Sequence, residues 1–144
     1  MPDANDSLIL LPVDGSPSSI RAAKHCAKLA KAFAARVILL NVQPAIEDWQ
    51  THGVGRHAAV DHHAARSREA LAEPEGVLKA AGIAFETLAE SGEAPEVIAR
   101  VAEACGCGSI VMGTRGQSEL KSLIMGGVGM KVIHLVRIPV TLVR

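Results

Sequence analysis

The sequence predicts a doubly wound α/β fold, with an open sheet of five parallel strands and helices on both faces. The 144 residues suffice for one domain, and a hydrophobic share of 49% excludes intrinsic disorder. Short continuous apolar runs alternate with longer segments whose apolar residues recur at helical spacing. Such runs, bounded by turns, are typical of strands buried on both faces of a parallel sheet with right-handed crossover helices.

Five apolar runs are predicted to be strands. The first ends in the turn-forming residues Asp14-Gly15-Ser16. The third alternates more than the others, so we expect it nearer an edge of the sheet. The five runs cover residues 8–13, 36–42, 83–88, 109–113 and 139–143.

The first helix is expected directly after the first strand. Ser16 suits the N-cap, and Pro17 suits the first helical position because its missing N–H costs nothing there. The apolar face of this helix is marked by Ile20, Ala23, Ala27, Ala30 and Ala34. The opposite, basic face is interpreted as solvated and carries Arg21, Lys24, Lys28 and Lys31.

The second helix is expected over residues 57–81, after a loop over residues 43–56. Pro74 should kink or interrupt it, because the proline ring clashes with the preceding turn. Gly82 suits the position just after the helix end. The inner side of this helix is marked by Val60, Ala64, Ser67, Leu71 and Leu78.

Two further helices complete the predicted order. One opens at Pro95 with an inner stripe of Ile98, Val101, Ala102 and Cys105. The last follows a glycine-rich region and runs to about Val136. Its helical character is expected to begin at Met130, after Gly126, Gly127 and Gly129.

Composition excludes several classes of partner. Lys+Arg and Asp+Glu are both 15, so no dominant basic surface exists for a nucleic acid. Aromatic residues make up 2%, which removes base-stacking platforms and leaves an aliphatic core. No apolar stretch approaches 18 residues, so we expect no membrane span. Three cysteines and the absence of a signal-peptide pattern predict a cytoplasmic protein.

Glycines gather after the fourth predicted strand, at Gly113, Gly116, Gly126 and Gly127. In an open parallel sheet, ligands bind beyond the carboxyl ends of the strands, where the strand order reverses. Glycines there allow main-chain N–H groups to approach a phosphate, and a helix N-terminus adds donors and partial positive charge. The alternative is that these glycines permit tight turns and close helix–sheet packing. Spacing alone leaves both interpretations open.

The glycine spacing Gly113-x2-Gly116-x9-Gly126 resembles the nucleotide loop of the universal stress protein family, G-x2-G-x9-G-[ST]. Residues 11–16, 92–100 and 138–144 resemble other segments of the same family. The resemblance covers nearly the whole chain. It implies a single domain over residues 1–144 with a Rossmann-like sheet in the order 3-2-1-4-5, of the adenine nucleotide alpha hydrolase-like type.

The resemblance also implies an adenine nucleotide site. Asp14 would lie against the adenosine, Pro12 and Val13 would wall the base, and Val42 would offer main-chain groups to the adenine edge. A second set of residues would border the ribose and phosphates. That set consists of Gly113, Arg115, Gly116, Gly126, Gly127 and Val128.

Gly127 departs from the pattern of the ATP-binding branch, which has Ser or Thr at this position. A hydroxyl that donates to phosphate is worth about 1.5–3 kcal/mol, or roughly 10- to 150-fold in affinity. The main-chain N–H remains, so a weakened site is expected rather than an abolished one. The implied ligand is ATP or another adenine nucleotide, with Mg²⁺ as a candidate companion of the phosphates.

The resemblance therefore implies a cytoplasmic stress-response protein that binds an adenine nucleotide as a sensor or adaptor. No catalytic residue is assigned, and any ATP hydrolysis is expected to be slow because no water-positioning carboxylate is evident beyond Asp14. A homodimer through the C-terminal strand, residues 139–143, is implied as well; the alternative is a monomer whose edge the last helix shields. The alternative function is a dimeric interaction module of the same fold that binds no nucleotide.

Two other groups of residues carry weaker expectations. A crowded set around the start of the second helix could sense pH or hold a metal, but no partner cluster completes a ligand set. That set is His52, His57, Asp61, His62 and His63. The spacing of Cys105 and Cys107 matches neither a redox motif nor half of a usual zinc site, so both are expected to be ordinary thiols.

Overall fold

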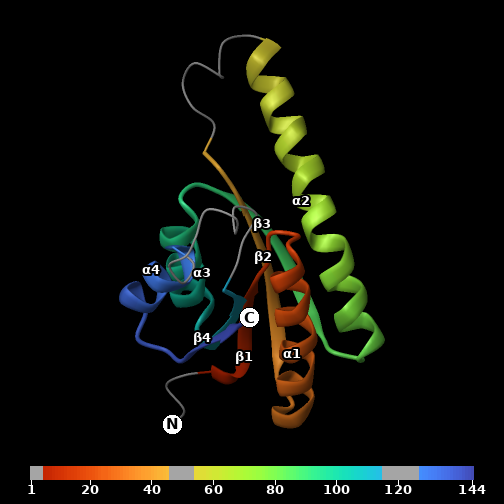
Figure 1. The fold of residues 1–144 in the computed structure, drawn as a ribbon, viewed down its shortest axis with the longest axis vertical. Helices are drawn as coiled ribbons and strands as arrows, with labels where there is room; N and C mark the ends of the chain where they lie inside the picture. The colour runs from red at the N-terminus through yellow and green to blue at the C-terminus, as the bar shows by residue number, and fades with distance from the viewer. Residues whose placement is uncertain (1–4, 46–53, 115–126) are drawn as a thin grey trace.

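The computed structural model describes residues 5–45, 54–114 and 127–144, and strands alternate with helices along these ranges (Figure 1). The strands are β1 (Asn5–Pro12), β2 (Arg36–Gln43), β3 (Phe85–Ser91), β4 (Cys107–Gly113) and β5 (Val140–Val143). The helices are α1 (Pro17–Phe33), α2 (Val54–Ala80), α3 (Ala94–Cys105) and α4 (Gly127–Leu135).

The five strands form one sheet in the order β3-β2-β1-β4-β5, which confirms the predicted fold class and strand order. All four neighbouring pairs are parallel. The pairing of β1 with β2 ends where Pro12 meets Leu40, and that of β4 with β5 ends where Gly113 meets Val143. Strand order reverses between β1 and β4, so their carboxyl ends form the switch point at which ligands bind in such sheets.

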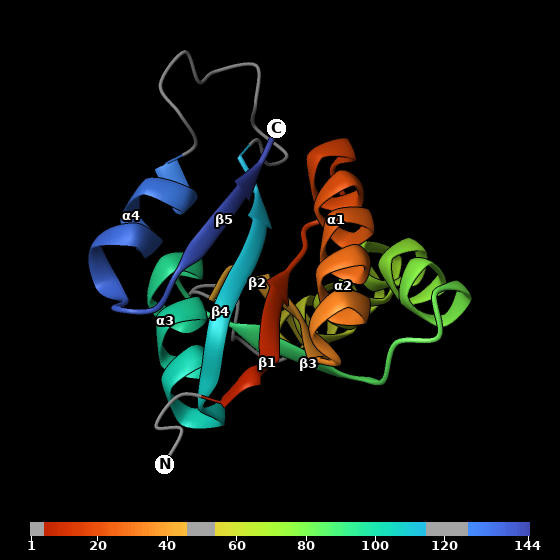
Figure 2. The same cartoon turned by 90° about the horizontal axis from the view of Figure 1, so that it is seen from below.

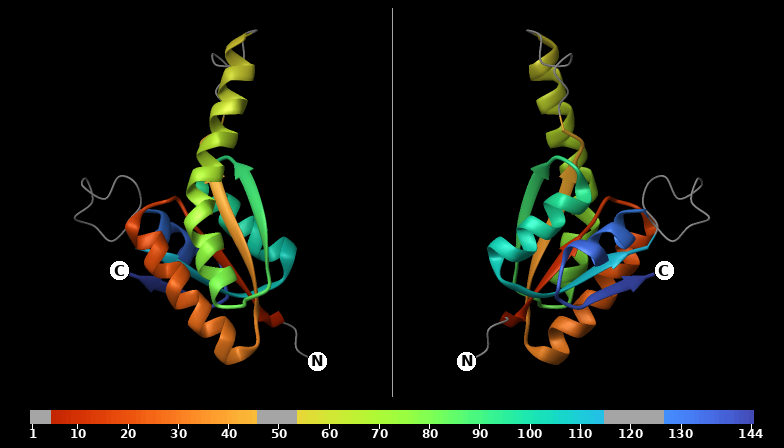
Figure 3. Two further views of the ribbon diagram at one scale, coloured as in Figure 1. Left: turned by 90° about the vertical axis from the view of Figure 1, so that its right-hand side faces the viewer. Right: turned by 90° about the vertical axis from the view of Figure 1, so that its left-hand side faces the viewer.

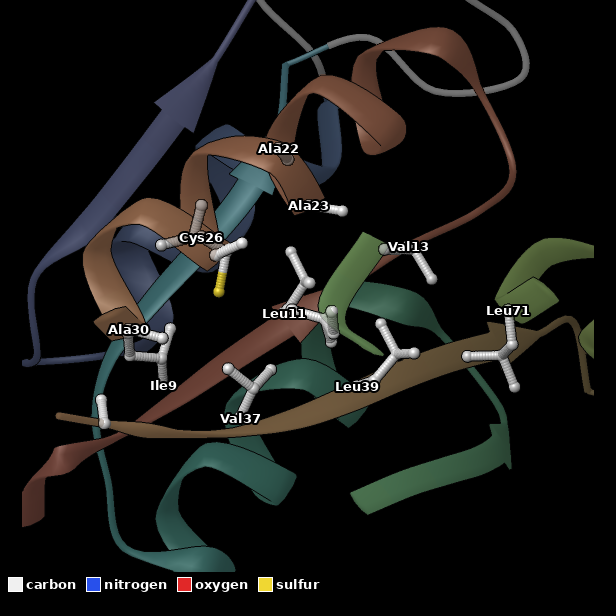
Figure 4. Close-up of a cluster of buried hydrophobic side chains, with 14 residues drawn as sticks. Ile9, Leu11, Val13, Ala22, Ala23, Cys26, Ala30, Val37, Leu39 and Leu71 are labelled. Atoms are coloured by element: carbon white, nitrogen blue, oxygen red, sulfur yellow. The ribbon is translucent and has the colours of Figure 1, made fainter. Parts of the chain in front are cut away.

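Helices cover both faces of the sheet, α1 and α2 on one face and α3 and α4 on the other (Figures 2 and 3). Odd-numbered residues of the central strands, such as Leu11 and Leu39, pack with α1 and α2. Even-numbered residues, such as Leu10 and Leu40, pack with α3 and α4. Figure 4 shows the first cluster, which is built from aliphatic side chains and the thiol of Cys26. The predicted aliphatic core is confirmed.

The ends of α1 show how the sequence sets a helix boundary. The Ser19 N–H donates to Ser16 Oγ over 3.2 Å, which confirms Ser16 as the N-cap. At the other end, the C-cap is Ala34, whose φ of 52° and ψ of 42° lie in the left-handed region. Ala34 was expected on the buried face of the helix, but it is exposed because the helix has already ended there.

Helix α2 differs from its prediction in two respects. It continues through Pro74 without interruption, and Pro74 itself is fully buried. Val60 is 46% exposed and Ala64 is exposed as well, so their predicted inward position is wrong. The reason is that the first half of α2 extends past the sheet, as Figures 1 and 3 show. Burial on this helix begins at Ser67.

The predictions for α3 and α4 each differ from the structure in one detail. Ile98, Val101 and Ala102 are buried as predicted, but Cys105 is exposed because α3 ends there and Gly106 turns the chain into β4. Helix α4 begins at Gly127 rather than at Met130, so Gly127 and Gly129 are part of it. None of the helices within the described ranges combines the length and hydropathy needed to cross a membrane.

Candidate functional site

The carboxyl edge of the sheet brings the predicted site segments together. Strands β1, β2 and β4 all end there, and both α1 and α4 begin at the same edge (Figure 2). Two helix N-termini therefore flank the switch point. Helix N-termini carry unpaired N–H donors and partial positive charge, and this edge is suited to an anionic ligand.

Asp14 organises the turn between β1 and α1. Its Oδ1 atom accepts from the Ser16 N–H and from Ser19 Oγ, each over 2.9 Å. The Asp14 N–H donates in turn to Ser19 Oγ over 3.0 Å. The carboxylate is thus held over the first turn of α1, where the helix dipole favours a negative charge. Asp14 is half-buried at the switch point, and its predicted contact with an adenosine stays a prediction.

Pro12 and Val13 are packed mainly against the protein itself. Pro12 is the last residue of β1 and is buried. The Val13 side chain is only 5% exposed and belongs to the core cluster beneath α1 and α2 (Figure 4). Both residues lie at the predicted place, but most of the Val13 side chain is already enclosed by core neighbours. Their role as walls of a base pocket remains a prediction.

Val42 lies two residues past the end of the β1–β2 pairing. The Val13 N–H donates to the Leu40 carbonyl over 2.8 Å, which turns the main-chain groups of Leu40 toward β1. Alternate residues of a strand direct their N–H and C=O groups to the same side. The N–H and C=O of Val42 therefore also point toward the β1 side, where β1 has ended. A donor and an acceptor are presented together at the switch point.

Gly113 occupies the corresponding place at the end of β4. Bonds from Ile110 N–H to the Pro139 carbonyl and from Thr114 N–H to the Val143 carbonyl, each 2.9 Å, show that even-numbered residues of β4 face β5. The main-chain carbonyl of Gly113 therefore faces the β1 side. Gly113 also packs closely on α1: a Cβ at this position would stand 2.8 Å from the main-chain carbonyl carbon of Ser18. This contact explains the glycine by packing, without excluding a ligand beside it.

Gly127 and Val128 form the start of α4 and are exposed. A Cβ at position 127 would have no neighbour within 4 Å among the described atoms, so a small side chain fits there. The predicted loop residues Arg115, Gly116 and Gly126 fall outside the described ranges. Gly127 is thus the described residue from which the phosphate part of the predicted site is best tested.

Asn41 was missed by the sequence-based site prediction. It is fully buried, and its amide makes three hydrogen bonds at the end of β2. Asn41 Nδ2 donates to the Val13 carbonyl over 2.8 Å, while Oδ1 accepts from Ser67 Oγ over 2.8 Å and from Gln43 Nε2 over 2.9 Å. The available signal was an asparagine within an otherwise apolar strand, because a buried amide needs dedicated partners.

Two of the three cysteines are buried and have low expected reactivity. Burial raises the pKa of Cys26 to about 12. Burial, with a smaller contribution from the charge of Cys105, raises the pKa of Cys107 to about 11. Cys105 is exposed. Thiols with raised pKa values stay protonated and are weak nucleophiles near neutral pH.

The described members of the histidine cluster and a hollow beside α3 lie apart from the predicted site. His57 and His62 are exposed, His52 lies outside the described ranges, and no group of metal-ligating side chains occurs among the described residues. A cavity of about 480 Å³ lies between α3 and α4 near the amino end of β4, away from the switch point. Its lining includes Ala102, Cys107, Leu135 and Ile138, none of which belongs to the predicted site.

Comparison with known proteins decides the family. A model of the universal stress protein family matches residues 8–144. The chain belongs to the universal stress protein family. It is 32% identical to a universal stress protein of Synechocystis, with 94% of this chain and 83% of the relative covered. It is 29% identical to one of Methanocaldococcus jannaschii, with coverage of 94% and 81%.

Solved structures agree with this universal stress protein fold. The hypothetical protein MJ0577 superposes with a TM-score of 0.83 at 25% identity, with 96% of this chain and 95% of that one covered. Universal stress protein UspA from Lactobacillus plantarum gives 0.82 at 21% identity, with coverage of 98% and 99%. A universal stress protein in complex with cAMP gives 0.69 at 23% identity and coverage of 96% and 97%. One from Archaeoglobus fulgidus in complex with dAMP gives 0.71 at 19% identity and coverage of 95% and 96%.

Proposed function

We propose that this universal stress protein binds an adenine nucleotide, ATP in particular, at the switch point between β1 and β4 and acts as a nucleotide-dependent sensor or adaptor. The observation that carries the proposal is the placement of Val42. Its N–H and C=O point past the end of β1. Family members of the same fold solved with cAMP and with dAMP support an adenine ligand.

The chemistry of Val42 suits the adenine edge. Adenine offers an acceptor at N1 beside a donor at its 6-amino group, and a single residue in a strand offers the complementary donor and acceptor. Guanine presents a protonated N1 and a 6-oxo group, so it would set donor against donor and acceptor against acceptor. Main-chain recognition at Val42 therefore favours adenine over guanine.

The phosphates would lie toward the N-terminus of α4. Gly127 would give its N–H there, with Val128 next to it, and Gly113, Arg115, Gly116 and Gly126 would border the ribose and phosphates as the family motif implies. No described atom lies within 4 Å of a Cβ built on Gly127, which is compatible with a phosphate approaching the main chain. No metal-ligating cluster occurs in the described part of the chain, so Mg²⁺ enters the proposal only as a companion ion of the ATP phosphates.

We further propose a homodimer through β5, in the cytoplasm. Strand β5 is an edge strand, and its four residues are all half-buried in the single chain. Met130 and Ile133 of α4 are about two-fifths exposed. An edge strand with apolar neighbours needs cover, and antiparallel pairing with β5 of a second copy across a two-fold axis would provide it.

The alternative is a dimeric interaction module of the same fold that binds no nucleotide. One observation favours it: the contact between Gly113 and Ser18 accounts for one motif glycine by packing alone. The two functions differ in whether the phosphate end of the site is occupied, and this can be measured directly.

Calorimetric titration with ATP, AMP and adenosine tests the proposal. A Gly127→Asp variant places a carboxylate at the N-terminus of α4, which favours the helix but repels phosphate. We expect it to weaken ATP binding at least about tenfold and to leave adenosine binding unchanged. The matched Gly127→Ala variant should bind ATP like the wild type. Absence of heat and of any thermal shift at millimolar ATP would instead support the empty module.

A further inference from the structure

The buried side-chain amide of Asn41 donates to a main-chain carbonyl that would otherwise accept a hydrogen bond within the sheet. In a continued parallel ladder, the Val13 carbonyl would accept a hydrogen bond from the Val42 N–H, just as the Val13 N–H donates to the Leu40 carbonyl. In the described part of the chain this bond is not formed. The Val13 carbonyl accepts instead from Asn41 Nδ2 over 2.8 Å.

The orientation of the Asn41 amide is determined by its partners. The Val13 carbonyl can only accept, so the amide nitrogen must face it. The oxygen faces two donors, Ser67 Oγ from α2 at 2.8 Å and Gln43 Nε2 at 2.9 Å. A flipped amide would place its oxygen against the Val13 carbonyl oxygen and lose that bond inside a fully buried site, which is costly for a polar group. The carboxamide is therefore held rigidly by β1, β2 and α2 together.

We propose that Asn41 is a positioning residue for the nucleobase: it occupies the Val13 carbonyl and thereby keeps the Val42 N–H available for a ligand acceptor. This inference rests on the proposed function for its ligand, a purine with an acceptor beside an amino group. The main-chain arrangement itself, with Asn41 bonded to Val13, is independent of the proposed function. An apolar residue at position 41 would leave the Val13 carbonyl without the side-chain donor, and the Val42 N–H would be its nearest replacement.

The first test needs no substitution. Amide hydrogen exchange of the wild-type protein without nucleotide compares Leu40 and Val42, which face the same side of β2. Leu40 lies within the paired register, whereas Val42 lies beyond it. We expect the Val42 amide to exchange at least about tenfold faster than that of Leu40, and to slow when ATP is added. A Val42 amide as protected as that of Leu40 before any nucleotide is present would overturn the inference.

The second test replaces Asn41 together with its α2 partner. The double variant Asn41→Leu/Ser67→Ala substitutes apolar groups for both, which avoids an orphaned hydroxyl. Without nucleotide, its Val42 amide should exchange about tenfold more slowly than in the wild type, and its affinity for ATP should fall about tenfold. The single variant Ser67→Ala keeps the Asn41 bond to Val13 and should match the wild type in Val42 exchange.

The outcomes separate this inference from the proposed function. Unchanged Val42 exchange in the double variant overturns the role of Asn41 even where ATP binds. A wild-type protein that binds no ATP overturns the proposed function, while the contrast in Val42 exchange still supports the main-chain role of Asn41. Should the double variant fail to fold, the wild-type comparison of Leu40 and Val42 decides alone.

Discussion

Gly113 at the end of β4 lies directly against Ser18 in the first turn of α1. A Cβ at position 113 would meet the Oγ of Ser18 and stand 2.8 Å from its main-chain carbonyl carbon. Ser18 Oγ also donates to the Val143 carbonyl over 3.1 Å, so the same turn of α1 is bonded to the end of β5. The main chain of α1 therefore cannot recede from Gly113 without breaking its hydrogen bond to β5.

The contact predicts that Gly113→Ala destabilises the fold. We expect a loss of about 1–3 kcal/mol in the free energy of unfolding, because the added methyl group overlaps a main-chain atom of Ser18 as well as its side chain. Urea denaturation measures the change. Gly127→Ala is the matched control, since no described atom lies within 4 Å of a Cβ at that position, and it should be neutral or slightly stabilising. Equal stability of Gly113→Ala and the wild type would show that the packing is looser than described.

Ala34 predicts a gain in stability. Its left-handed backbone costs a residue with a Cβ roughly 1–2 kcal/mol, which glycine avoids. Glycine also adds entropy to the unfolded chain, so Ala34→Gly should raise the free energy of unfolding by about 0.5–1 kcal/mol. The control Ala32→Gly lies inside α1 and should lower it by about 1 kcal/mol. Urea midpoints that move in the same direction for both variants would contradict the described end of α1.

The alternation of strands and helices could be predicted from the sequence. A strand that is buried on both faces of a sheet appears as a short continuous apolar run, whereas the helices show apolar residues at helical spacing. Helix ends were predicted correctly at Ser16, Pro17 and Gly82. Ser16 caps a free N–H, Pro17 lacks the N–H that would be unpaired, and Gly82 adopts a positive φ. Val60 was misplaced because periodicity cannot show how far a helix runs past its sheet. Ala34 was misplaced because a helical pattern continues across a C-cap that carries no glycine.

The sequence predicted which edge of the sheet carries the candidate site, but not the contacts among its residues. A glycine that admits a ligand and a glycine that admits a neighbouring helix both lack a Cβ, so only the three-dimensional structure distinguishes the two cases for Gly113. Asn41 was missed because its importance depends on Val13 and Ser67, which are distant in sequence and meet only when β1, β2 and α2 have assembled. Predictions from one strand cannot identify such a contact.

The three cysteines should differ in reactivity. Cys105 is exposed, whereas burial raises the pKa of Cys26 to about 12 and that of Cys107 to about 11. Iodoacetamide at pH 8 should therefore modify the native protein at Cys105 alone, and all three thiols in denaturant. Peptide mass spectrometry locates the label. Rapid labelling of Cys26 in the native state would contradict its burial, and the variant Cys105→Ser should stay unlabelled.

The same thiols predict a loss of stability at alkaline pH. The pKa values of Cys26 and Cys107 in the folded protein both lie above the ordinary value of 9.0. The contribution of the two buried thiols to the free energy of unfolding is therefore complete below pH 9 and is lost as the pH rises toward 11 and 12. The difference in free energy of unfolding between the wild type and Cys26→Ala should therefore shrink between pH 8 and pH 10.5. Urea denaturation at both pH values measures it, and a constant difference would show that Cys26 ionises normally.

Gly127→Ser should strengthen ATP binding. The substitution supplies the hydroxyl that the family motif has at this position, and a Cβ there meets none of the described atoms within 4 Å. One added hydrogen bond to a charged phosphate predicts at least about tenfold tighter binding. Gly127→Ala provides the same Cβ without the hydroxyl and should bind ATP like the wild type, while adenosine should bind all three proteins equally. If calorimetry finds that Ser and Ala at position 127 give the same ATP affinity, the phosphates do not reach the start of α4.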